Sequence, residues 1–169
     1  GNAWEWCHDW HAPYPTTHQY NPLGPEVGQV VGKRYLRVFR GGSYGYAAAY
    51  HQNTFRDITG PEPDKGTANL GLRLVLSDDV NFQTIHVNDT LSFHMMDVKG
   101  GTFMMGAMEG DTQAYDNEKP AHEVALTYNY YIAQTEVTQA LWKAVMGNNP
   151  STMIGDDLPV NNVLWEEAH

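Results

Sequence analysis

Alternating hydrophobic and polar positions predict several short strands along this chain. Residues 35–40 alternate in this way, and the pair Gly41-Gly42 that follows lets the backbone turn sharply or approach another segment closely. Residues 70–76 predict another strand, because a run of aliphatic residues there is bounded by turn formers. Four prolines between Trp10 and Val27 exclude a long helix from that stretch.

The second part of the chain shows the same pattern more strongly. Residues 93–98 and 101–106 predict two strands, and the sequence Lys99-Gly100-Gly101 between them is typical of a hairpin turn. Two more strands are predicted at 122–126 and 128–132, where the residues again alternate.

One helix is predicted to begin after Thr138 and to end at Gly147. Thr138 is a good N-cap residue, and Val137 and Trp142 stand at the two positions of a hydrophobic staple. Glycine commonly closes a helix at its C-terminus. The apolar face is interpreted as core, with the members Leu141, Trp142, Val145 and Met146. A second helix is predicted to begin near Trp165.

Composition adds a loop-rich character and an acidic second half. The 169 residues include 16 Gly, 9 Pro, 5 Trp and 10 Tyr, a content that disfavours a helical bundle. Residues 81–169 hold three Lys or Arg against twelve Asp or Glu, so the net charge of −10 lies almost wholly there. Such a surface repels phosphate backbones, and nucleic acid is therefore not expected as a partner.

The single cysteine, Cys7, limits the redox and metal chemistry of the chain. One thiol cannot form an internal disulfide or a thiolate metal cluster. No apolar run reaches the length of a membrane span. Because the chain does not begin with methionine, we expect a segment to precede it.

The first half of the chain carries the motifs of one family in family order. Its first ten residues, GNAWEWCHDW, resemble the signature GN[VA]WEW-x-x-DW of the formylglycine-generating enzyme (sulfatase-modifying factor) family. Further motifs of that family follow: NPLGP at 21–25, RVFRGGSY at 37–44, FR at 55–56 and NLGLR at 69–73. In the family these motifs close the domain.

The second half resembles the opening of the same family's domain. The matching motifs are GGTFMMG at 100–106, EKPAH at 118–122, TEVT at 135–138 and LPVNNVLW at 158–165. The resemblance therefore implies a C-terminal half at 1–77, a connector at 78–91 and an N-terminal half at 92–169. A fragment of a tandem array and a circular permutant both have this order, and cuts that fall inside motifs favour the tandem fragment.

The resemblance implies an α+β, loop-rich, C-type-lectin-like fold with short antiparallel strands and few helices. Enzymes of the family oxidise a sulfatase cysteine with oxygen and copper, using two thiols in a GGSY-x-C-x-x-x-x-C stretch. In that register this chain carries Tyr46 and His51. Thiolates are what Cu(I) selects, so neither a catalytic residue nor copper is expected here.

The resemblance also implies a structural calcium site in the opening motif. The ligands carried over are Glu5 and the backbone carbonyls of Gly1 and Ala3, whereas the family's upstream Asn is not in this chain. Calcium takes six to eight oxygens, so this site would be incomplete and weak. The alternative for Glu5 is a hydrogen-bonded acid that holds the loop in place.

Three functions follow as hypotheses from these observations. The first is a noncatalytic scaffold that binds a protein or small molecule through a variable loop, with the candidate contacts Tyr44, Tyr46, Tyr50, His51, Asn53 and Arg56. The second is formylglycine generation on sulfatase cysteines, by this chain or by a complete neighbouring copy in a larger enzyme. The third is one repeat in an array, with neighbouring copies as partners. The resemblance implies a secreted, periplasmic or envelope-associated protein.

Overall fold

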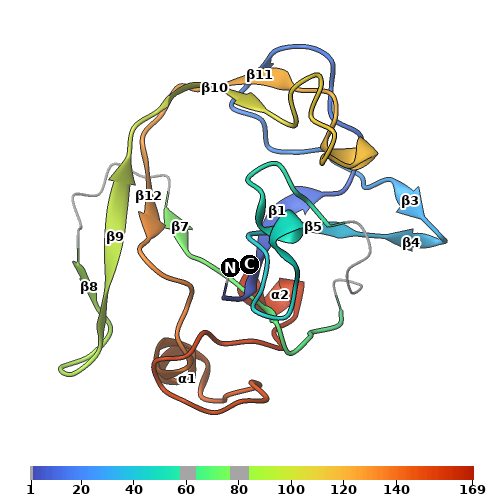
Figure 1. Ribbon diagram of the computed structural model, residues 1–169. Coiled ribbons are helices and arrows are strands. Elements are labelled where there is room, and N and C mark those ends of the chain that lie inside the picture. The colour runs from blue at the N-terminus through green and yellow to red at the C-terminus, as the bar shows by residue number, and fades with distance from the viewer. Residues whose placement is uncertain (1, 58–63, 77–83) are drawn as a thin grey trace.

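The computed structural model describes residues 2–57, 64–76 and 84–169, and its folded part is α+β and rich in loops. The strands are β1 (Trp4–Trp10), β2 (Gln19–Tyr20), β3 (Val30–Val31), β4 (Arg34–Tyr35), β5 (Arg37–Arg40), β6 (Leu70–Gly71), β7 (Val75–Leu76), β8 (Thr84–His86), β9 (Ser92–Val98), β10 (Gly101–Met105), β11 (His122–Leu126) and β12 (Tyr130–Ala133). The helices are α1 (Gln139–Met146), α2 (Trp165–Ala168) and the 3-10 turns η1 (Ala48–His51) and η2 (Asp116–Glu118). Figure 1 shows their arrangement.

A small sheet in the order β5-β1-β6 lies at the centre of the molecule (Figure 1). Strand β1 pairs antiparallel with β5, where Trp6 faces Phe39, and parallel with β6, where Trp4 faces Leu70. Both tryptophans are buried, and Glu5 between them is only half-buried, as expected for alternation along a strand. The sheet thus directs two large aromatic rings into the core.

A long antiparallel ribbon curves away from this centre, and β8 pairs along the free edge of β9. Strand β9 pairs antiparallel with β12, and β10 pairs antiparallel with β11. Strand β9 therefore continues into β10 along the ribbon, and the predicted hairpin at Lys99-Gly100-Gly101 is wrong. A Cβ at Gly100 would lie 2.5 Å from the carbonyl oxygen of Tyr128. Glycine stands there because the backbone of residues 126–128 approaches closely, and glycine in a strand often marks such a close approach.

Strand pairing joins the two halves of the chain at two places. Strand β2 pairs parallel with β11, where Gln19 faces Val124. Strand β7 pairs antiparallel with β12, where Leu76 faces Tyr131. The predicted strand at 70–76 is therefore split between two sheets, because β6 belongs to the central sheet and β7 to the ribbon.

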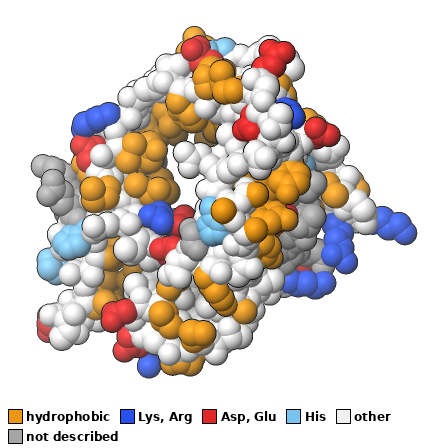
Figure 2. Space-filling view, viewed as in Figure 1, with side chains coloured by type: hydrophobic (Ala, Val, Ile, Leu, Met, Phe, Trp, Pro, Cys, Tyr) orange, Lys and Arg blue, Asp and Glu red, His pale blue; other side chains and the backbone are white. Residues whose placement is uncertain are grey.

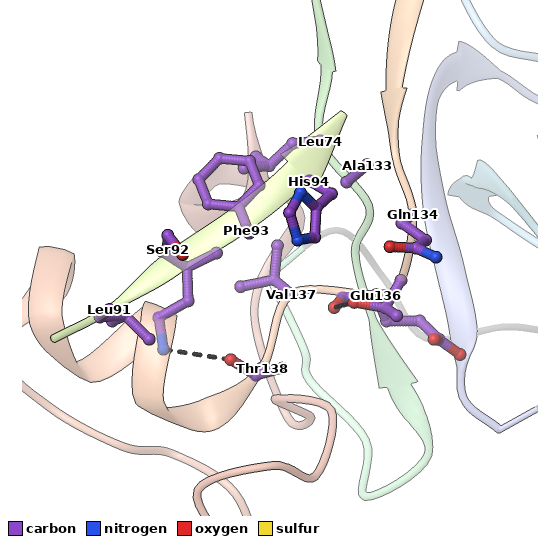
Figure 3. A pocket seen from close by; sticks show the side chains of 12 residues that line it. Leu74, Leu91, Ser92, Phe93, His94, Ala133, Gln134, Glu136, Val137 and Thr138 are labelled. Carbon is purple, nitrogen blue, oxygen red and sulfur yellow. Dashed lines mark hydrogen bonds between the residues drawn. The ribbon is translucent and has the colours of Figure 1, made fainter. Parts of the chain in front are cut away.

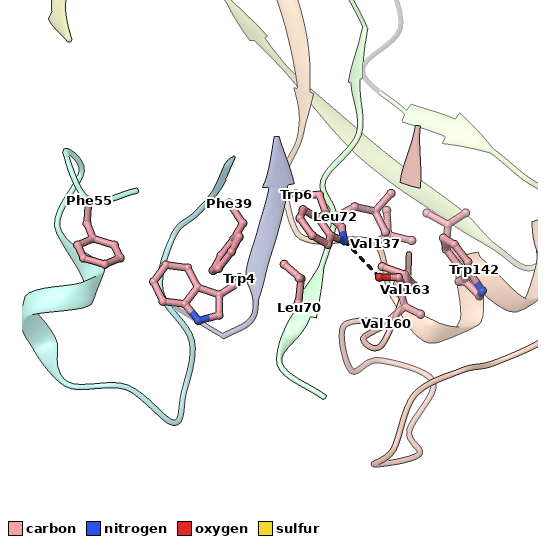
Figure 4. Packing of buried hydrophobic residues seen from close by; sticks show 11 residues of the cluster. Trp4, Trp6, Phe39, Phe55, Leu70, Leu72, Val137, Trp142, Val160 and Val163 are labelled. Carbon is pink, nitrogen blue, oxygen red and sulfur yellow. Dashed lines mark hydrogen bonds between the residues drawn. The ribbon is translucent and has the colours of Figure 1, made fainter. Parts of the chain in front are cut away.

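The core contains residues from both halves (Figure 4). Its buried members are Trp4, Trp6, Phe39, Phe55, Leu70 and Leu72 from the first half and Val137, Leu141, Trp142, Val160 and Val163 from the second. The indole Nε1 of Trp6 also donates a hydrogen bond of 3.2 Å to the carbonyl oxygen of Val163. The two halves therefore dock into one core. The origin of their order in a tandem array stays a prediction, as does the division at 78–91, of which 84–86 forms β8 and 78–83 lies outside the described residues.

Helix α1 begins and ends as the sequence predicts. The Thr138 side chain accepts a hydrogen bond from the backbone N–H of Leu141, and Gly147 closes the helix with a φ of 76°. The apolar face is narrower than predicted, however. Leu141 and Trp142 are buried, whereas Val145 and Met146 are exposed. The two turns of this short helix contact the core only near its N-terminus, where the chain arrives from Val137.

The surface seen in Figure 2 carries Lys and Arg side chains over β3 and β4, whereas Asp and Glu are scattered over the rest of this face. The last residue of the chain lies beside β1, because the imidazole rings of His8 and His169 are 4.7 Å apart. Within the described part of the chain, every helix is too short or too polar to cross a membrane.

The shared core gives a direct test of this packing. Trp142→Ala should lower the free energy of unfolding by about 3 to 5 kcal/mol, because it leaves a cavity where α1 packs against the core. Urea denaturation followed by tryptophan fluorescence measures this loss. Val145→Ala, on the exposed side of the same helix, is the matched control and should change stability by no more than about 0.5 kcal/mol. Equal effects of the two substitutions would contradict the described orientation of α1.

Candidate functional site

The family's GGSY motif forms a tight turn at the end of β5. Gly41 and Gly42 have φ angles of 93° and 68°, which side chains other than glycine rarely adopt. Ser43 is fully buried, and its hydroxyl accepts a 3.2 Å hydrogen bond from the Asn69 side chain. The backbone N–H of Tyr44 donates to the carbonyl oxygen of Asn2. The turn is thereby held between β1 and the segment before β6.

The residues at the two thiol positions of the family are engaged in packing. The ring of Tyr46 meets the Trp4 ring edge to face, with centroids 5.4 Å apart. The His51 ring covers the turn so closely that a Cβ on Gly42 would lie 2.6 Å from its Nδ1. Its Nε2 lies 3.3 Å from the carbonyl oxygen of Tyr46. The phenol and the imidazole therefore fill the space next to the GGSY turn.

Aromatic rings continue from this turn across to the second half of the chain. Tyr50 of η1 meets Tyr46 and Phe55 edge to face, at centroid distances of 5.5 and 5.1 Å. Tyr115 stacks near Tyr50 and lies 5.5 Å from Phe55. A hydrogen bond with Tyr50 raises the pKa of Tyr115 above its ordinary value. Sequence reasoning missed Tyr115, whose only signal was its place in the loop between two family motifs.

The six predicted ligand contacts do not meet in one cavity. Tyr44 is 69% exposed and lines a cavity of about 170 Å³. Asn2 and Ala3 of the first half and Met153 of the second half line the same cavity. Tyr46, Tyr50 and His51 form the aromatic group beside the turn. Asn53 is exposed, and Arg56 is buried against the ring of Tyr14 on the other side of this loop. That these residues bind a ligand stays a prediction.

The carboxylate of Glu5, predicted as a calcium ligand, contacts an arginine. Arg73 donates to it through Nη2 at 2.7 Å and through Nε at 3.0 and 3.1 Å. Both carboxylate oxygens of Glu5 thus accept hydrogen bonds from one guanidinium. This arrangement is the one expected if Glu5 is a hydrogen-bonded acid that holds the loop in place. Gly1 lies outside the described residues, and those described include no cluster of three or more His, Cys, Asp or Glu that could hold a metal ion. Calcium at Gly1, Ala3 and Glu5 stays a prediction of the resemblance.

Another cavity, of about 190 Å³, lies between β9 and the start of α1. Figure 3 shows that its lining comes from β9, the end of β12 and the residues around Thr138. Glu136 borders it, but this carboxylate lies 3.8 Å from the guanidinium of Arg73 and is already compensated. The one carboxylate that lines the cavity is thus already paired, and the cavity is a gap in the packing beside the core.

Cys7 lies on β1, away from the GGSY turn. Its side chain is half-buried on the face of β1 opposite Trp4 and Trp6. Loss of solvation raises the pKa of the thiol to about 12, with Asp9 and Glu5 adding to the effect and Arg40 opposing it. The thiol has a weak contact of 3.9 Å with the carbonyl oxygen of Glu5. At neutral pH it is protonated and inert, so it cannot replace the missing pair.

This raised pKa predicts slow thiol chemistry in the folded protein. At pH 8 the thiolate fraction of Cys7 should be at least about a hundredfold below that of an ordinary cysteine. Reaction with 5,5′-dithiobis(2-nitrobenzoate), followed by absorbance, should therefore be at least about a hundredfold slower in native protein than in guanidinium chloride. The native rate should still rise with pH at pH 10, because the raised pKa lies above that range. A native rate equal to the denatured rate at pH 8 would show that the thiol is not buried.

Comparisons with known proteins identify the family of this chain. A family model for the sulfatase-modifying factor enzyme 1-like domain matches residues 1–78 and 82–169. A curated relative, chaperone protein LppX of Paenibacillus barcinonensis, is 36% identical over 81 residues, which are 48% of this chain and 25% of that protein. The chain therefore spans about a quarter of that relative's length. No solved structure matches. The chain belongs to the sulfatase-modifying factor enzyme 1-like domain family.

Proposed function

We propose that this chain is a noncatalytic member of the family and serves as a binding scaffold, with a polypeptide as its ligand. The observation that carries the proposal is the replacement of both family thiols by Tyr46 and His51. Cu(I) is bound by soft thiolate ligands, and a phenol with an imidazole is a poor substitute. Both side chains also have structural roles beside the GGSY turn, where Tyr46 packs against Trp4 and His51 covers Gly42.

An exposed apolar surface beside the turn supports the binding role. Tyr44, Met153, Ile154 and Leu158 are all partly or largely exposed, and three of them line the same cavity. Contiguous apolar surface of this kind is typical of protein interaction sites. Tyrosine suits such a surface, because it offers a rigid ring and a polar tip. We name this group of four residues the Tyr44 surface.

The relative's name supports a polypeptide ligand, because LppX is described as a chaperone protein. Neighbouring copies of the domain are further candidate partners, and an extracytoplasmic location is part of the proposal. The alternative function is formylglycine generation, either by this chain or by a complete neighbouring copy. The family match supports that alternative only at the level of the domain.

Restoring the two thiols tests the noncatalytic assignment. The wild-type chain should take no Cu(I) from a bicinchoninate complex in a competition titration. The double variant Tyr46→Cys with His51→Cys should gain Cu(I) binding, because it restores the spacing of the family's pair. Conversion of a sulfatase-derived cysteine peptide to its aldehyde by the wild-type chain, detected by mass spectrometry, would refute the proposal.

The binding role has its own test. Peptides selected on the folded chain from a phage-displayed library should lose affinity about tenfold or more on Tyr44→Ala, because few exposed aromatic residues dominate such contacts. Affinity is measured by biolayer interferometry with synthetic peptides. Val145→Ala, an exposed apolar residue on α1, is the matched control and should leave affinity unchanged. Selected peptides that bind both variants equally would place their site elsewhere.

A further inference from the structure

The largest of the described cavities has no role in the proposed function. It measures about 450 Å³ and opens between the segment from Asp9 to Pro25, the end of β5, and one face of β10 and β11. Binding cavities for small organic ligands have volumes of this order. Both halves of the chain line it, and the pairing of β2 with β11 closes one side. It shares no lining residue with the cavity at the Tyr44 surface.

Two arginines and a tyrosine form a connected polar group in the wall of this cavity. The Arg56 guanidinium lies over the ring of Tyr14, 3.7 Å from its centroid, and Nη2 of Arg40 donates to the Tyr14 hydroxyl. Nε of Arg56 donates to the carbonyl oxygen of Asn117 at 2.6 Å. Nη1 of Arg40 donates to three consecutive carbonyl oxygens, at residues 53 to 55. The two guanidinium groups are therefore held in place before any ligand arrives.

The charge of these arginines is incompletely compensated by the part of the chain that the structure describes. Arg56 is 4% exposed, and its Nη2 is buried without a hydrogen-bond partner. Asp9 and Glu118 favour the charged form of Arg56, but among the described residues no carboxylate oxygen lies within 4 Å of either guanidinium. Burial lowers the pKa of Arg56, and Arg40 lowers it further. A buried donor without a partner in a native structure calls for an explanation, and a bound anion is one.

The positive field extends to a neighbouring histidine. His11 is buried, and neither ring nitrogen has a hydrogen-bond partner. Burial, together with the charge of Arg56, lowers the pKa of His11 to about 4. The imidazole is therefore neutral at pH 7. It neither adds a positive charge nor offsets the arginines.

Most of the rest of the wall is apolar and aromatic, although Asp9, Gln19 and His122 also line it. Trp10, Leu23, Phe103 and Met105 line the cavity, and Leu23 and Phe103 are exposed at its rim. A small inorganic anion would leave this surface in contact with water. A ligand with an apolar body would bury it and gain the hydrophobic contribution. The wall thus combines a cationic group at one place with a largely apolar remainder.

We propose that this cavity binds an amphipathic organic anion, with its acidic head group at Arg40 and Arg56 and its apolar body against Trp10 and Phe103. The arrangement suits a carboxylate, because the buried Nη2 of Arg56 is a charged donor that can give it a strong hydrogen bond. The site is separate from the Tyr44 surface, because the two cavities share no lining residue. Of the six residues predicted to contact a ligand through the loop, only Arg56 lines it.

Octanoate and octanol, which share an apolar chain and differ in charge, test the proposal with the intact chain. Titrations followed by ¹H–¹⁵N correlation spectra should show octanoate binding about tenfold or more tightly than octanol, with the largest shifts at Gln19, Phe103 and the Trp10 indole. Arg40→Gln should reduce octanoate affinity about tenfold and leave octanol affinity unchanged. Phe103→Ala should weaken both ligands.

Two controls keep the test decisive. Circular dichroism checks that Arg40→Gln is folded, and if it is not, the comparison of octanoate with octanol on the wild-type chain still decides. Tyr44→Ala should bind octanoate like the wild type, so a failure of the Tyr44 surface and a failure of this cavity are separable. Equal affinity for the two ligands, shifts centred on Tyr44, or no octanoate binding at millimolar concentration would each overturn the proposal.

Discussion

The packing of the GNAWEW strand against residues near the other end of the chain is the constraint on which the rest of this structure depends. Trp4 and Trp6 share one core with Val160 and Val163, and the indole of Trp6 also donates to the carbonyl of Val163. Trp165 adds a 2.9 Å hydrogen bond to the carbonyl of Cys7. Loop-rich folds have few regular hydrogen-bond ladders, so large buried rings supply much of their stability. Separation of these segments would expose the rings of both halves.

This structure also shows how the GGSY turn is held in a chain without the family's pair of thiols. The GGSY turn is held by Asn2 and Asn69, neither of which belongs to the thiol chemistry. Tyr46 and His51 occupy the space beside the turn and add contacts to Trp4 and Gly42. The turn is thus held by contacts that need no thiol. Replacement of the thiols suits a fold whose functions reside in exchangeable site residues.

The two cavities that carry the proposals differ in how they arise. Both cavities are lined by side chains from both halves of the chain. Tyr44 and Met153 line one, and Arg40 and Phe103 line the other. Neither set is contiguous in sequence. The first is apolar and open, and suits a polypeptide. The second holds two arginines in an apolar wall, and suits a small anion.

Local chemistry made several features readable from the sequence. The Thr138 cap and the Gly147 stop of α1, the alternation in β5 and β11, and the sharp turn at Gly41-Gly42 each follow from short-range preferences. The family motifs likewise identified the domain and the lost thiols. These signals lie within a few residues of one another, so no knowledge of the fold was needed.

Other features depend on contacts between distant residues. Gly100 looks like a hairpin glycine, but the approach of Leu126 and Tyr128 makes it a point of close strand contact. Val145 fits an apolar helix face, yet α1 meets the core only near its first turn. The sequence alone determined the family, the local elements and the absence of paired thiols. Only the tertiary structure decided that the halves share a core, that Arg73 binds Glu5 and that Arg40 and Arg56 line one cavity, because these depend on which distant segments pack together.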